Sequence, residues 1–142
     1  MRYAEFGSPL YVIAPPVEPA LVGWSWEMHG SVPVFGEAGY LTEAGIPIRV
    51  RTWASLPEGA RAAIAAHSAD LIANADAGTS ALHGEHDTTV VVSGRPVPTR
   101  AWALGRFQFV ALTLANRLVT VAHPATIGPP ALTTLDRWPQ RG

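Results

Sequence analysis

The densest group of side chains able to do chemistry is the run His83-Gly84-Glu85-His86-Asp87. Neutral imidazoles and carboxylates are ligands that suit zinc and other divalent ions. The run falls in a polar stretch, residues 79–87, that we expect to form a loop, where a His-x-x-His spacing is not held on one helix face. The sequence places no third ligand beside His83 and His86. We therefore assign no metal and no cofactor and expect a solvated loop, with metal binding by the two histidines as the alternative.

Ser25, Glu27 and His29 carry the side chains of a catalytic triad within one strand-like segment. Successive residues on one face of a strand lie roughly 6–7 Å apart, so Ser25 and His29 would be about 13 Å apart. Proton transfer needs a separation of about 3 Å, and no partner from another strand can be named. We therefore predict an exposed polar face and assign no catalytic residue.

His67 falls within the apolar stripe of a predicted helix and is a candidate buried acid or base. Such a histidine is more often a core or boundary residue that donates one hydrogen bond. The alternative is an enzyme or small-molecule binder that uses His67, or His29 with Glu27, in a pocket between sheet and helix.

Arginine and tryptophan recur together on two predicted strands. Arg49, Arg51 and Trp53 alternate on one segment, and Arg100 and Trp102 alternate on another. If both sets lie on the same side of a sheet, they form a surface of the two residue types that dominate hot spots in protein interfaces. We therefore predict that these five residues bind a partner. The alternative is an ordinary sheet face, on which arginine stems pack over tryptophan rings and the guanidinium groups pair with acids.

These candidates need a sheet to position them, and the clearest one begins at residue 88. Four apolar runs, at residues 88–93, 97–104, 107–115 and 118–123, are separated by turn-sized gaps. Links this short join antiparallel neighbours, because a parallel pair needs a crossover of a dozen or more residues. Apolar runs and alternation predict three earlier strands, at residues 10–14, 21–29 and 46–53, and we expect the last two to pair.

A helix is predicted between the third strand and this meander. Ser55 as N-cap, Pro57 and Glu58 make a capping-box start for a helix that runs to about Ala75. The glycine-rich residues 30–45 are typical of a long loop, and a short Pro-capped helix is expected at about residues 130–138. The predicted fold is a single α+β domain over residues 1–142, with an antiparallel sheet of six to seven strands covered by one main helix and a short C-terminal helix.

The composition limits the classes of function. The 142 residues carry 10 basic and 11 acidic side chains, a net charge of −1 that offers no broad attraction to nucleic acid or anionic membrane. The absence of cysteine excludes disulfides and thiolate chemistry. Charged residues are only 15% of the chain, against about 25% in ordinary soluble domains. A neutral surface of this kind favours a protein partner or self-association.

All the basic residues are arginine, which together with many Ala, Pro and Gly residues indicates a bacterial, GC-rich genome. The N-terminus lacks the continuous apolar segment of a signal peptide, and no stretch reaches the roughly 18 apolar residues of a membrane span. We expect a cytoplasmic protein, with a mature form whose leader has been removed as the alternative.

Two local motifs carry a resemblance to a known superfamily. Residues 90–97, Val-Val-Val-Ser-Gly-Arg-Pro-Val, match a strand that ends near Gly-Arg-Pro, and residues 118–125 match a last strand with a Pro/Ala exit. With the order of elements from about residue 46 to 138, they resemble the PsbP-like α/β/α sandwich superfamily, which includes LpqN-type lipoproteins and Eag-type chaperones. Most members resemble adaptors, chaperones or assembly factors, so the resemblance implies a non-catalytic role.

We therefore expect a non-enzymatic adaptor or chaperone-like domain that binds a protein partner, such as a secreted or membrane-associated one, through its sheet face or through residues 30–45. Two alternatives stay open. One is a small-molecule binder or enzyme with a pocket between sheet and helix, and the other is a structural subunit of a larger assembly.

Overall fold

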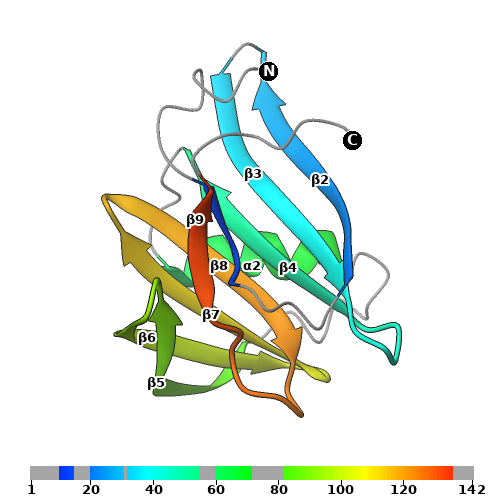
Figure 1. Cartoon of the computed structure of the whole chain (residues 1–142), viewed down its shortest axis with the longest axis vertical. Helices are drawn as coiled ribbons and strands as arrows, with labels where there is room; N and C mark the ends of the chain where they lie inside the picture. The colour runs from blue at the N-terminus through cyan, green and yellow to red at the C-terminus, as the bar shows by residue number, and fades with distance from the viewer. Residues whose placement is uncertain (1–9, 15–19, 31, 55–59, 72–81, 136–142) are drawn as a thin grey trace.

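A computed structural model of the chain describes residues 10–14, 20–30, 32–54, 60–71 and 82–135. Within them the chain forms one sheet of nine strands in the order β1-β9-β5-β6-β7-β8-β4-β3-β2 (Figure 1). The strands are β1 (Leu10–Ile13), β2 (Ala20–His29), β3 (Val32–Leu41), β4 (Pro47–Trp53), β5 (His83–Val92), β6 (Arg95–Leu104), β7 (Phe107–Leu114), β8 (Arg117–Pro124) and β9 (Leu132–Leu135).

The predicted α+β fold class is therefore wrong. The chain is mostly β, its curled sheet holds nine strands instead of six to seven, and one pairing is parallel, at Val92 and Leu132 of β5 and β9. One short helix, α2 (Ala60–Leu71), lies among the described residues. The expected N-cap, Ser55, and the end of the predicted helix at Ala75 lie outside them.

The meander from β5 to β8 is confirmed, because each strand pairs antiparallel with the next. Its turns are tight. Ser93 and Gly94 both have positive φ, as do Ala115 and Asn116, and Gly105 has a φ of 59°. Two consecutive residues with positive φ match the type I′ turn, whose twist suits a two-residue hairpin.

Four other expectations were wrong. The run at residues 83–87 is not a solvated loop, since it begins β5 and pairs with β6. Residues 30–45 are not a long loop, since most of them form β3, which hydrogen-bonds to β2 on one side and β4 on the other. Consequently the strand at 46–53 does not pair with the strand at 21–29. The segment expected to be a C-terminal helix contains β9, which pairs antiparallel with β1.

The sheet has two covered faces, which we call the helix face and the inner face. Helix α2 packs on β7 and β8 across the helix face, and β1 and β9 cross in front of the opposite, inner face (Figure 1). Strand alternation supplies both cores. On β7, for example, Phe109 belongs to the core under α2, and its neighbour Val110 belongs to the core under β1 and β9.

Candidate functional site

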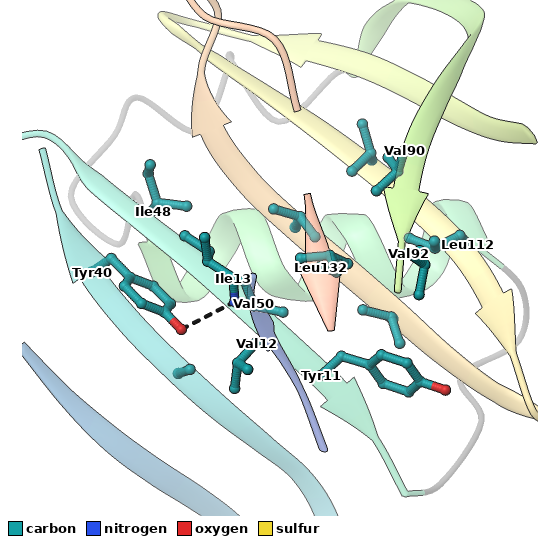
Figure 2. Packing of buried hydrophobic residues seen from close by; sticks show 14 of the residues in the cluster. Tyr11, Val12, Ile13, Tyr40, Ile48, Val50, Val90, Val92, Leu112 and Leu132 are labelled. Atoms are coloured by element: carbon teal, nitrogen blue, oxygen red, sulfur yellow. Dashed lines mark hydrogen bonds between the residues drawn. The ribbon is translucent and has the colours of Figure 1, made fainter. Parts of the chain in front are cut away.

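The sheet has two edge strands, β1 and β2, and they differ. Side chains of other strands cover the edge of β1. All four residues of β1 are buried against β4 and its neighbours. The N–H of Tyr11 donates to Thr52 Oγ1 at 3.1 Å. The N–H of Ile13 donates to Tyr40 Oη, also at 3.1 Å (Figure 2). These bonds satisfy donors that an edge strand would otherwise present to another chain.

The β2 end is open. Strand β2 is ten residues long, and β3 is its one neighbour among the described strands. Ser25, Glu27 and His29 are exposed, and Trp24 is half-buried against the inner core. Register shifts flank residues 23–27, so this stretch is the regular part of the strand. A long, regular, exposed edge is a template for pairing with another strand.

Two glycines lie side by side on the helix face of the sheet, between the edge of β2 and the side chain of Arg49. Gly23 of β2 is opposite Gly39 of β3, and Gly39 is opposite Arg49 of β4. A Cβ on Gly39 would lie 3.5 Å from Arg49 Cδ, whereas a Cβ on Gly23 would meet nothing within 4 Å. The Arg49 side chain thus lies across Gly39 and leaves the surface over Gly23 open. That side chain is 38% exposed.

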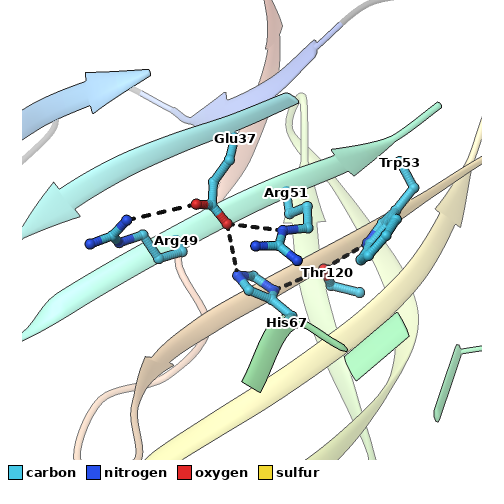
Figure 3. A network of polar contacts seen from close by, with 6 residues as sticks. All are labelled: Glu37, Arg49, Arg51, Trp53, His67 and Thr120. Atoms are coloured by element: carbon cyan, nitrogen blue, oxygen red, sulfur yellow. Dashed lines mark hydrogen bonds and ion pairs between the residues drawn. The ribbon is translucent and has the colours of Figure 1, made fainter. Parts of the chain in front are cut away.

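Arg49 belongs to a cluster of charged side chains around Glu37 (Figure 3). Glu37 accepts a hydrogen bond from Arg51 Nε at 3.0 Å, lies 3.1 Å from His67 Nε2 and lies 3.7 Å from Arg49 Nη1. Arg51 also stacks over Phe35, with its Cζ 3.7 Å from the ring centroid. Among the described residues, two guanidinium groups face this one carboxylate, and Arg49 is the member whose side chain is partly exposed.

Glu37 is ionised in this setting. Burial alone would raise the pKa of its carboxyl group, but the hydrogen bond from His67 and the charges of His67 and Arg51 outweigh burial, and the net pKa is lowered from 4.5. A buried carboxylate that stays charged holds Arg51 in place, and Arg51 is itself almost fully buried.

His67 extends the cluster to a hydroxyl group. Its Nδ1 lies 2.9 Å from Thr120 Oγ1, and Thr120 Oγ1 also accepts a hydrogen bond from Trp53 Nε1 at 3.0 Å. His67 Nε2 faces the Glu37 carboxylate, so the imidazole lies between the Thr120 hydroxyl group and that carboxylate. This order, hydroxyl to imidazole to carboxylate, is that of a catalytic triad. However, His67 and Thr120 are fully buried, and the Thr120 hydroxyl oxygen already accepts a hydrogen bond from the Trp53 indole. A substrate therefore cannot reach this hydroxyl group.

The five residues predicted to bind a partner do lie on one side of the sheet. In the register, Arg51 is opposite Thr120, Thr120 is opposite Ala111, and Ala111 is opposite Arg100. The structure places most of this set in a covered layer, since Arg51, Trp53 and Trp102 are buried.

Arg100 is exposed and pairs with Glu85 and Asp87, and Glu85 also accepts a hydrogen bond from Trp102 Nε1. Guanidinium groups paired with acids are typical of an ordinary sheet face, and partner binding by the five residues stays a prediction.

The remaining candidates do not converge. His29 and His86 are exposed on different strands, and His86 Nδ1 lies 2.8 Å from the Gly84 carbonyl oxygen. Within the described ranges, no three histidine or acidic residues are grouped so that they could hold a metal ion.

A pocket of about 290 Å³ lies between the β3–β4 turn and the segment after β8, away from His67. Among the described residues that line it, Glu43 is the one ionisable side chain, and Ile46, Pro124 and Ile127 are among the others.

Comparisons with protein-family models, with curated proteins and with solved structures find no match. The resemblance to the PsbP-like superfamily therefore stays a prediction. In the part of the chain that the structure describes, no helix has the length and apolar character needed to cross a membrane.

Proposed function

We propose that this chain is a non-enzymatic protein-binding domain that takes an extended segment of a partner along the free edge of β2. The observation that carries the proposal is the contrast between the two ends of the sheet: side chains cap the donors of β1, whereas β2 leaves a regular edge exposed. Strand addition to such an edge is a common mode of peptide recognition, in which main-chain hydrogen bonds supply affinity and side-chain sites supply specificity.

The specificity element of this proposal is Arg49. An acidic side chain on the added strand, opposite Gly23, would lie over two glycines and meet the partly exposed Arg49 side chain. Because Arg49 is partly exposed and lies 3.7 Å from Glu37, an acid is favoured at this position over a neutral or basic residue. The proposal thus predicts preference for a partner segment with one acidic residue.

Burial of the triad-like set supports a non-catalytic role. A general base and nucleophile must be within hydrogen-bond reach of a substrate, and His67 and Thr120 are enclosed by the sheet, α2 and Trp53.

Site-specific photo-crosslinking tests the proposal. We would replace Ser25 by benzoylphenylalanine, illuminate the protein in lysate of the producing organism, and map the adducts by mass spectrometry. The matched control carries the same group at Val91, which is 42% exposed but belongs to β5, a strand with neighbours on both sides.

We expect adducts at position 25 that map to one short segment of one protein, with none at position 91, and loss of these adducts when Arg49→Gln is added. Absence of adducts at position 25, or equal yields at both positions, would contradict the proposal.

A further inference from the structure

Resting on the proposed function, we infer that the strand added to β2 is β2 of a second copy of this chain. The two strands run antiparallel about a two-fold axis at Ser25. The closed product is an isologous dimer, in which each contact occurs twice.

The sequence of β2 suits this axis. Residues 23–27 read Gly-Trp-Ser-Trp-Glu, with a tryptophan on either side of the central serine. The same five residues are the regular part of the strand, between the two register shifts. Pairing about Ser25 sets position 24 opposite position 26 of the second copy, and aromatic residue types at opposite positions favour antiparallel pairing.

The axis also brings opposite charges together. It sets Gly23 opposite Glu27 of the second copy. A two-fold axis perpendicular to the sheet leaves the same face of both copies on the same side, so that Glu27 lies on the helix face with Arg49. Its Cα would lie two strand spacings, about 10 Å, from Gly39, over which Arg49 lies. A glutamate side chain and one hydrogen bond of about 2.9 Å span most of this gap, and the half-exposed Arg49 side chain covers the rest.

Both charges are available for this contact. Glu27 is exposed and makes no ion pair among the described residues, and Arg49 contacts Glu37 only at 3.7 Å. The two glycines on the path leave no Cβ to block it. The interface therefore contains the Glu27–Arg49 pair twice, once on each side of the axis.

Cysteine crosslinking tests the register, and the natural chain contributes no background because it has no cysteine. Directly opposite residues of an antiparallel pair have Cα atoms about 4.5–5.5 Å apart, within the range of a disulfide. We expect Ser25→Cys to form a disulfide-linked dimer under mild oxidation with diamide, and the exposed control Val91→Cys to stay monomeric. Gly23→Cys alone and Glu27→Cys alone should crosslink poorly, whereas a mixture of the two should crosslink well.

Sedimentation tests the charge pair without oxidation. We expect the natural chain to sediment as a dimer and Glu27→Arg to raise the dissociation constant at least tenfold. The control Glu43→Arg, which makes the same charge change on the exposed β3–β4 turn, should leave it unchanged.

A monomeric natural chain, or Ser25→Cys that crosslinks no better than Val91→Cys, would overturn the dimer. If the photo-adducts at position 25 then contain a different protein, strand addition to β2 stands and only the identity of the partner is wrong. If position 25 gives no adduct of any kind, both proposals fail.

Discussion

At the scale of single residues, Glu37 is the side chain that decides whether the helix-face cluster is stable. It is the carboxylate that faces Arg51, and both are buried. Removing one partner of a buried ion pair leaves an uncompensated charge and costs about 3–5 kcal/mol. We expect Glu37→Gln to lower the free energy of unfolding by about this amount in urea at pH 7.

The matched control is Glu85→Gln. Glu85 also pairs with an arginine, but its side chain is 43% exposed. Exposed pairs contribute about 0–1 kcal/mol, so this variant should stay close to the natural chain. Equal losses in the two variants would show that burial of the Glu37 pair does not matter.

The pH dependence provides a second signature of the same change. Because the pKa of Glu37 is lowered from 4.5 in the folded state, its contribution to stability is present above pH 4.5 and is lost as the pH falls through the lower, folded-state value. The stability difference between the natural chain and Glu37→Gln should therefore shrink below pH 4.5. A difference that stays constant into acid would contradict the assigned ionisation of Glu37.

At the scale of elements, the capped edge of β1 holds the β1–β9 pair on the inner face. Tyr40→Phe removes the oxygen that accepts from the Ile13 N–H, leaving a buried donor without that acceptor at a cost of about 1–3 kcal/mol. We expect this loss in urea unfolding, together with faster hydrogen exchange of the Ile13 amide. Thr52→Val should do the same to the Tyr11 amide, whereas Thr52→Ser, which keeps the hydroxyl, should retain its protection.

The titration of Tyr40 predicts how the free energy of unfolding changes at alkaline pH. Burial raises the pKa of its phenol above 10.0, so the folded state holds this proton more tightly than the unfolded state does. Its contribution to stability is present below pH 10 and is lost as the pH rises through the raised value. Tyr40→Phe should lack this part of the alkaline loss, and an unchanged alkaline profile would place the titration elsewhere.

Elements with a strong local signal were predictable from the sequence, whereas an element with a weak local signal or a distant partner was not. The meander strands show as apolar runs bounded by turn residues, because each pairs with its neighbour in sequence. Strand β3 was missed because Gly36 and Gly39 weaken its strand character, and its pairing with β2 and β4 compensates. Strand β9 was missed because four residues form a strand only beside β1.

The residues of the candidate site were likewise predictable only in part. Alternation along β4 correctly placed Arg49, Arg51 and Trp53 on one face, since alternation is a local property. Glu37 was missed because residues 30–45 were expected to form a loop, whereas they contain β3, which pairs with β4. Thr120 was missed because it follows its partner Trp53 by 67 residues, and the sequence does not reveal the register of β4 on β8. A buried arginine does demand an acid, and this requirement is the signal that could have directed the search to Glu37.

At the scale of the whole molecule, two cores share one sheet, and this arrangement predicts that they unfold together. Phe109 and Val110 are neighbours on β7 but belong to different cores, so neither core can lose its strands while the other keeps them. We expect Phe109→Ala, in the core under α2, to cost about 3–5 kcal/mol, and Ile48→Ala, in the core under β1 and β9, to cost about 2–5 kcal/mol.

The decisive measurement is whether each variant keeps a single transition. Circular dichroism and tryptophan fluorescence should give coincident urea midpoints in both variants, with the slope of the natural chain. Ile48→Val, which removes one methyl group and should cost about 0.5–1.5 kcal/mol, provides the graded control. If Ile48→Ala instead separated an early loss of β1 and β9 from a later loss of β6 to β8, the two cores would be independent folding units on one sheet.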